Sequence, residues 1–102
     1  MRFDLRLPIL VKDDTFEQHI EKLQEEVSEL IEELRVLHLH PDKKQAVKVL
    51  SEALDNMQVI IGVIDNTAER FDIKLKDAEF DHVTKLYSRG WNFKKFLRLK
   101  ED

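Results

Sequence analysis

The chain has 102 residues, of which 42% are hydrophobic and 37% are charged, so it is long enough for one folded domain and too apolar for a disordered chain. Its 21 acidic residues outnumber its 17 basic ones, and the net charge of −4 excludes a general nucleic-acid binder, which needs an excess of Lys and Arg. The absence of cysteine excludes disulfides and Cys-ligated zinc, and it predicts a protein of the reducing cytoplasm.

The first part of the chain is predicted to be extended. Residues 3–11 alternate apolar and polar side chains around Pro8, a pattern typical of an extended segment or an edge strand. Residues 1–4 run directly into this mixed pattern and lack the long apolar stretch of a signal peptide. We therefore expect regular helical structure to begin only after this segment.

A first helix is predicted to run from about residue 15 to about residue 38. Thr15 and Gln18 have the spacing of a capping box, which satisfies free N–H groups at a helix start. Apolar residues then recur at helical spacing: Leu23, Val27, Leu30, Ile31 and Leu34. Residues 38–42 break this pattern, and Asp42 with Gln45 three positions later predicts that a second helix starts after a short loop.

The second helix is predicted to be apolar over most of its surface. Residues 46–64 are the most apolar stretch of the chain, but Lys48, Glu52 and Asp55 interrupt it, which would be costly in a membrane span. We therefore expect a buried helix, either central in the fold or at a subunit interface, and a homodimer or homotetramer. Gly62 weakens the helix and suggests close packing or a kink there.

A third helix is predicted after a connection at residues 71–74. Asp77 is a candidate N-cap for it, and Gly90 is the expected stop. Residues 91–102 do not distinguish a strand from a short helix. The whole chain, residues 1–102, is thus predicted to be one all-α domain with its helical core at about 15–90: an antiparallel helical hairpin plus a third helix, with short extended terminal segments.

Acidic residues with helical spacing occur on both of the first two predicted helices. Glu25-Glu26 and Glu29 lie on the first helix, and Glu52 and Asp55 on the second. Residues three apart lie about 60° from each other around a helix axis, so each helix presents a carboxylate pair on one side. The short connecting loop makes the helices antiparallel neighbours, so that the two pairs can face each other. Converging carboxylates repel unless a hard cation neutralises them, which predicts a Mg²⁺ site.

The order EExxE followed by ExxD resembles the motifs of the all-α nucleoside triphosphate pyrophosphohydrolase superfamily, which includes MazG. The resemblance covers roughly residues 15–90. It implies a MazG-like helical bundle and Mg²⁺-dependent hydrolysis of a (d)NTP to (d)NMP and pyrophosphate, with cleavage between the α- and β-phosphates. It further implies a role in cleansing the nucleotide pool and a nucleoside triphosphate as substrate.

The resemblance also implies roles for individual residues. Four acids are expected to bind one or more Mg²⁺ or Mn²⁺ ions: Glu26, Glu29, Glu52 and Asp55. Glu26 or Glu29 would also assist deprotonation of the attacking water, and Glu25 would orient a ligand or a water. On the third helix, Lys85 and Arg89 are candidates for contacting the substrate, because two like charges four apart suggest an anionic partner. Relatives often carry an asparagine near residues 84–88, and this chain has none there.

Two alternative functions remain open from the sequence. Phosphoribosyl-ATP pyrophosphohydrolases share both acidic motifs. A non-catalytic helical module would instead keep its acids solvated and bind a partner through the apolar second helix. The isolated histidines, His19 and His82, are expected at the surface or the edge of the core. Walker-type ATPases are excluded, because the chain has only two glycines and neither builds a phosphate-binding loop.

Overall fold

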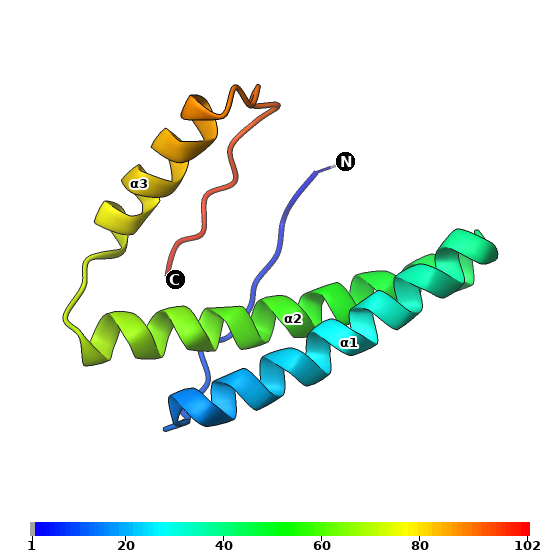
Figure 1. Ribbon diagram of the computed structural model, residues 1–102, viewed down its shortest axis with the longest axis horizontal. Helices are drawn as coiled ribbons and strands as arrows, with labels where there is room; N and C mark the ends of the chain where they lie inside the picture. The colour runs from blue at the N-terminus through cyan, green and yellow to red at the C-terminus, as the bar shows by residue number, and fades with distance from the viewer. Residues whose placement is uncertain (1) are drawn as a thin grey trace.

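The computed structural model describes residues 2–102, and the predicted all-α class is confirmed. Three helices account for 65% of the chain, and residues 2–102 contain no strand. They are α1 (Phe16–Leu39), α2 (Lys43–Arg70) and α3 (Leu75–Ser88). Figure 1 shows that α1 and α2 form an antiparallel hairpin, whereas α3 projects from the end of α2. Met1, which belongs to the predicted single domain, lies outside the described residues.

The starts of α1 and α2 follow the local chemistry of the sequence. Thr15 Oγ1 accepts a hydrogen bond from the backbone N–H of Gln18 at 3.1 Å, and Gln18 Oε1 accepts one from the backbone N–H of Thr15 at 2.8 Å. This pair is the predicted capping box. At α2, Asp42 Oδ1 accepts a hydrogen bond from the Gln45 backbone N–H at 2.7 Å. Both predicted helix starts are confirmed.

The predicted start of the third helix is wrong. Lys74 occupies the N-cap of α3 and makes no side-chain cap hydrogen bond, and Asp77 lies inside the first turn. The physical reason is that a carboxylate also stabilises a helix from its first turn, where it faces free N–H groups and the positive end of the helix dipole. Gly90 ends the helix as predicted, because its φ of 79° is a left-handed conformation that favours glycine.

The seam between α1 and α2 is held by polar side chains. Three amides of α2, at positions 45, 56 and 66, are spaced by about three helical turns and therefore lie along one stripe. Each is hydrogen-bonded to α1: Gln45 to Glu33, Asn56 to the backbone carbonyl of Glu26, and Asn66 to His19. The amides thus fix the register of the two helices.

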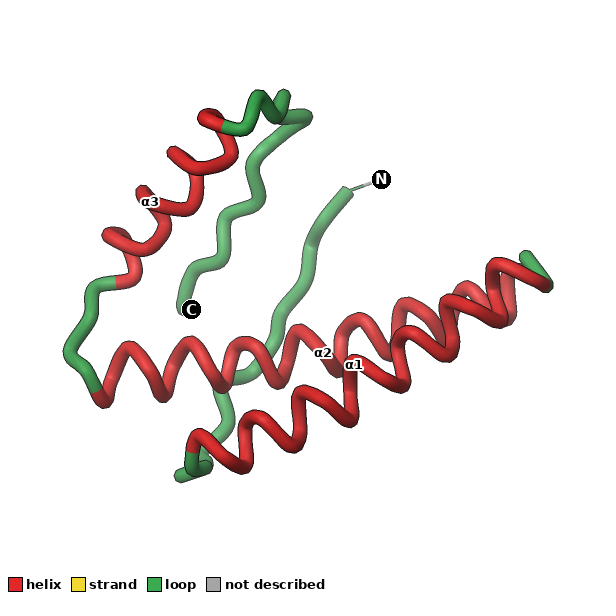
Figure 2. The backbone as a smooth tube through the Cα atoms, viewed as in Figure 1, coloured by secondary structure: helices red, strands yellow, loops and turns green. Residues whose placement is uncertain are grey.

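No apolar residue among those described is buried, so the second helix is not central in the fold of the single chain, and its place at a subunit interface stays a prediction. Val47 and Leu50 of α2 are 59% and 64% exposed. The physical reason is that α3 projects away from the hairpin and forms no layer over its apolar surface (Figure 2). The chain exposes 9353 Å², whereas a folded monomer of its mass would expose about 6,000 Å².

The terminal segments have no regular secondary structure, so residues 3–11 form no edge strand and residues 91–102 form neither of the two structures considered for them. The N-terminal segment is tied to α2, since Gln58 Nε2 donates to the carbonyl of Pro8 at 2.6 Å. The C-terminal tail packs aromatic rings: the centroids of Tyr87 and Phe93 are 4.7 Å apart. Within residues 2–102, no helix has both the length and the apolar character to cross a membrane.

Candidate metal centre

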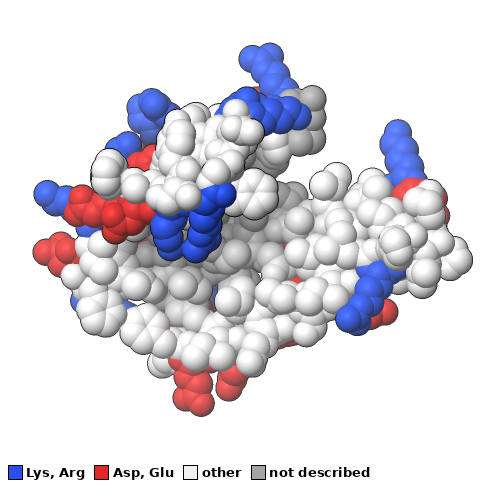
Figure 3. Space-filling model, turned by 45° about the horizontal axis from the view of Figure 1, so that its top comes forward, with Lys and Arg blue, Asp and Glu red and all other residues white. Residues whose placement is uncertain are grey.

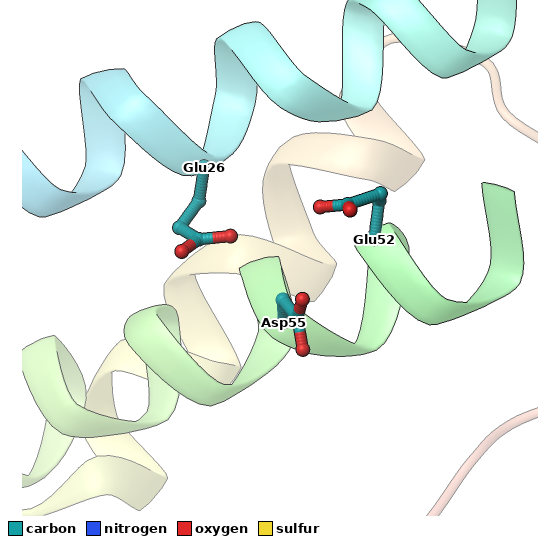
Figure 4. A group of neighbouring side chains, drawn as sticks. All are labelled: Glu26, Glu52 and Asp55. Carbon is teal, nitrogen blue, oxygen red and sulfur yellow. The ribbon is translucent and has the colours of Figure 1, made fainter. Parts of the chain in front are cut away.

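Three of the predicted acids converge between α1 and α2. Glu26 of α1 and Glu52 and Asp55 of α2 each place a carboxylate oxygen so that all three atoms lie within 4.8 Å of one another. Figure 4 shows these side chains extending from the two facing helices into the space between them. The close approach follows from the helical spacing of Glu52 and Asp55 and from the antiparallel pairing of the helices.

The cluster has unsatisfied acceptors. Glu26 is 7% exposed, and the Oε2 atoms of Glu26 and Glu52 are buried without a hydrogen-bond partner. Burial raises the pKa of Glu52, and the nearby charges of Glu29, Asp55 and Glu26 raise this pKa further, as does hydrogen bonding with Glu29. A buried acceptor without a donor is costly, so the cluster is a place where a cation or a proton stabilises the fold.

Glu29 and Glu25 lie at the border of this cluster. Glu29 is close enough to Glu52 to affect its pKa, but it is not one of the three converging acids. Glu25 is exposed, and its carboxylate lies 3.6 Å from the ammonium group of Lys22. The structure therefore brings together three of the four predicted metal ligands, with Glu29 beside Glu52.

Two residues at the cluster were not singled out from the sequence. Asn56 is 6% exposed, and its Nδ2 donates to the backbone carbonyls of Glu26 at 2.9 Å and Glu52 at 2.8 Å, so it fixes the helices at the level of the acids. Lys22 Nζ lies 3.1 Å from Glu26 Oε1. A hydrogen bond to Glu26 and the charges of Glu25 and Glu26 raise the pKa of Lys22. Two features of the sequence could have indicated these residues: an amide within an otherwise apolar helix, and a lysine four residues before a glutamate.

His19 is a third residue whose place differs from the expectation. It is 8% exposed and pairs with Asn66, so it is a buried residue of the seam rather than a residue of the surface or of the core edge. A polar residue can be buried at little cost when it has a hydrogen-bond partner. That partner lies 47 positions along the chain, which local sequence patterns do not reveal.

The two basic candidates on α3 are not at the acidic cluster. Lys85 and Arg89 are exposed, and α3 makes no extensive contact with α1 or α2 within the described chain. Figure 1 shows α3 directed away from the hairpin. A contact between these residues and a ligand at the acids would need α3 of this chain or of a second copy to lie over the site.

The donors at the cluster fit a hard divalent cation. All three converging groups are carboxylates, and Mg²⁺ prefers oxygen ligands. Opposite ligands of such an ion at about 2.0–2.1 Å lie about 4 Å apart, close to the spread of the three oxygens, so small side-chain rotations suffice. The two unpartnered oxygens of Glu26 and Glu52 give the ion acceptors that no protein group uses.

Comparisons of the chain with models of protein families, with curated proteins and with solved structures gave no match.

Proposed function

We propose that the chain is a Mg²⁺-dependent nucleoside triphosphate pyrophosphohydrolase of the MazG-like kind. The observation that carries the proposal is the set of three converging carboxylates with two buried, unpartnered oxygens, on Glu26 and Glu52. The motif resemblance assigns that chemistry to these acids, and Asp55 completes the set. The products would be a (d)NMP and pyrophosphate, and the role would be to cleanse the nucleotide pool in the cytoplasm.

In this proposal the acids have different roles in the reaction. Glu26, Glu52 and Asp55 would hold Mg²⁺ or Mn²⁺, which when bound supplies positive charge to the triphosphate oxygens. Glu29, whose charge acts on Glu52 but which lies outside the converging set, would accept a proton from the attacking water. The water oxygen forms a bond to phosphorus as the α–β anhydride bond breaks, and pyrophosphate leaves. Glu25, at the exposed edge, would orient a water or a ligand.

Basic residues would balance the charge of the leaving pyrophosphate. Lys22 already lies beside Glu26, and once a cation neutralises that acid its ammonium group is free to contact a phosphate. Lys85 and Arg89 can serve this purpose only where α3 lies over the site. We keep them in the proposal as substrate contacts supplied by a moved or second α3.

A homodimer or homotetramer is part of the proposal. The described chain has no buried apolar residue and exposes about 3,000 Å² more than a compact monomer of its mass would. Figure 3 shows a broad area of uncharged side chains across the hairpin. The radius of gyration of the chain, 15.9 Å, also exceeds the roughly 13 Å of a compact chain of this length. A second copy packed on the outer faces of α1 and α2 would bury this surface.

The same exposed surface favours a second candidate, the non-catalytic helical module. In that case the exposed apolar residues of α2, such as Leu50 and Ile60, would bind a different protein. That function does not need the converging acids, so it predicts no metal binding and a harmless Glu52→Gln change. The buried, unpartnered oxygens of Glu26 and Glu52 favour the hydrolase.

Product analysis tests the proposal. The full chain is incubated with the four standard dNTPs, dUTP, the NTPs and phosphoribosyl-ATP, with and without Mg²⁺, and the phosphate products are identified. Glu52→Gln should lower turnover by at least about 100-fold, since the loss of a group that acts in the transition state costs this much. Glu32→Gln, which changes an exposed acid of α1, is the matched control and should behave as wild type.

The outcomes separate the candidates. Mg²⁺-dependent release of pyrophosphate and a monophosphate, lost in Glu52→Gln, supports the proposal. Turnover of phosphoribosyl-ATP alone would replace the nucleotide-cleansing role with the sister activity. No turnover of any compound with the purified oligomer would contradict the proposal and favour the non-catalytic module.

A further inference from the structure

A pocket of about 320 Å³ lies beside the acidic cluster, between α1, α2 and the N-terminal segment. Glu26 and Asp55 line it, so it is continuous with the candidate metal centre. His19 and Asn66 also line it. Because a helix rises about 1.5 Å per residue, Glu26 and His19 lie about 10 Å apart along α1. The pocket therefore extends from the acids along the hairpin seam.

The end of the pocket away from the acids is polar and fixed. His19 is 8% exposed, and its Nε2 lies 2.7 Å from Nδ2 of Asn66. The Asn66 Nδ2 also donates to the backbone carbonyl of Asp14 at 3.5 Å, so both of its N–H groups are engaged and Oδ1 is the atom that can accept a hydrogen bond from the edge of a nucleobase. Because the two side chains hold each other, they need little reordering when a ligand binds.

Gly62 keeps the middle of the pocket open. It lies on α2 between the acids and Asn66, and it lines the pocket together with Val59. A Cβ at position 62 would meet only His19 Cε1, at 3.9 Å, which is ordinary van der Waals contact, so a larger side chain there would occupy space of the pocket. Glycine is unfavourable inside a helix, and an open space beside it gives a reason for its presence. Gly62 and the Val59 side chain line this part of the pocket, where they offer an apolar surface to a ring.

The N-terminal segment forms the remaining wall. Leu10, Lys12 and Asp14 line the pocket, and the segment is held in place where Arg70 donates to the backbone carbonyl of Asp14 at 2.6 Å. Lys12 lies 3.5 Å from the Asp14 carboxylate. A segment without regular secondary structure thus closes over the helix seam at this point.

We propose that this pocket binds the nucleoside part of the substrate. Asn66 and His19 would contact the nucleobase, and the phosphates would be directed toward Glu26 and Asp55. The direction of the phosphates rests on the proposed function, whereas the pocket and its polar end do not. A volume of about 320 Å³ is at the lower end for ligand pockets, which span roughly 300–1,000 Å³, so it favours a single-ring, pyrimidine base. Asn66 is then the residue that determines base preference.

The test follows the imidazole signals of His19 by NMR in the full chain without Mg²⁺. Uridine, cytidine, adenosine and guanosine 5′-monophosphates are titrated separately. The pyrimidine monophosphates should shift the His19 signals and bind more tightly than the purine ones. Asn66→Leu, which keeps roughly the size of the side chain but removes the Oδ1 acceptor, should weaken pyrimidine binding by about tenfold.

Two further variants separate the pocket from the stability of the fold. Gly62→Leu fills the pocket without removing a polar group, and it should abolish monophosphate binding while the helix content by circular dichroism stays at the wild-type value. Ser51→Leu adds the same side chain at an exposed position of α2 and should bind as wild type does.

The result tests the assignment of the pocket separately from the proposed hydrolysis reaction. His19 signals that respond to pyrimidine monophosphates support the pocket assignment even if no triphosphate is hydrolysed, in which case the proposed function alone fails. Mg²⁺-dependent hydrolysis with unchanged His19 signals would overturn the pocket assignment alone. Equal binding of purine and pyrimidine monophosphates would also overturn it, as would wild-type binding by Gly62→Leu.

Discussion

The α1–α2 seam and the outer faces of the same hairpin reverse the usual distribution of polar and apolar residues, in which apolar residues are buried and polar ones are exposed. In the seam the buried residues are polar, and they include Glu26 and Asn56. On the outer faces the apolar residues are exposed, as Leu50 and Ile60 of α2 are. Buried polar groups make a fold specific when each is hydrogen-bonded, and exposed apolar area stabilises only once it is covered. The seam is therefore suited to chemistry, and the outer faces to another chain.

The outer faces should give the largest effect when they are changed. Leu50 is 64% exposed in the single chain and would be buried in the proposed oligomer. Leu50→Glu would place an unpaired charge in that interface, so we expect the dissociation constant to rise by about 100-fold, or about 3 kcal/mol. Sedimentation equilibrium measures this change.

Thr84→Glu is the matched control for this change, because it adds the same charge at an exposed position of α3, outside the proposed interface. It should leave the assembly intact. A chain that is monomeric in both wild type and Leu50→Glu would contradict the assignment of the outer faces to a second copy.

The seam should be sensitive to the loss of a single amide. Asn56 donates to the backbone carbonyls of Glu26 and Glu52, so Asn56→Ala removes two buried hydrogen bonds. We expect the free energy of unfolding to fall by about 2 kcal/mol, measured by urea denaturation at fixed protein concentration. Gln24→Ala, at an exposed position of α1, should change it by less than about 0.5 kcal/mol. Equal losses in both variants would mean that the seam amide does not hold the hairpin.

The acids of the seam should make metal binding depend on pH. Burial and neighbouring carboxylates raise the pKa of Glu52 above its ordinary value of 4.5. Metal affinity, measured by calorimetry, should therefore fall by about tenfold for each pH unit below that raised pKa, because a proton competes with the cation. Glu32→Gln should show the same pH profile of metal affinity as wild type. A metal affinity that stays unchanged down to pH 4.5 would contradict the assignment of Glu52 as a ligand.

The same pKa shift has a consequence for the metal-free chain. The folded state holds the Glu52 proton more tightly than the unfolded state does, because its pKa is raised on folding. The contribution of Glu52 to stability therefore becomes more favourable as the pH falls from above the raised pKa toward 4.5. Glu52→Gln should remove this contribution, which thermal unfolding across that pH window would detect.

The smallest of these effects is expected at a helix end, outside both regions. Thr15→Ala removes one half of the capping box of α1 and should lower the free energy of unfolding by about 1 kcal/mol. Urea denaturation measures the change. Thr15→Ser keeps the hydroxyl and should restore most of the loss; if it is as unstable as Thr15→Ala, the hydrogen bond to Gln18 is not the cause.

Local features of the sequence sufficed for the presence of three helices, for the starts of α1 and α2, and for much of the acidic cluster. Capping residues such as Thr15 and Asp42 act within one helical turn, and the pairing of Glu52 with Asp55 depends only on helical spacing. The convergence of these acids with Glu26 needed one further step, the short loop that makes the helices antiparallel.

The features that sequence reasoning missed depend on distant contacts. The burial of His19 requires Asn66 as its partner, and the position of α3 depends on packing that local patterns do not specify. Apolar periodicity gave the position of α2 but not its environment, because an apolar face is equally compatible with a core and with an interface between chains.

The most direct test of the central claim is the effect of Mg²⁺ on thermal unfolding of wild type, Glu52→Gln and Glu32→Gln. A ligand that binds only the folded state raises the midpoint, so we predict that Mg²⁺ raises it for wild type and for Glu32→Gln but not for Glu52→Gln. No shift for wild type, or an equal shift for all three proteins, would contradict a metal centre built from Glu26, Glu52 and Asp55.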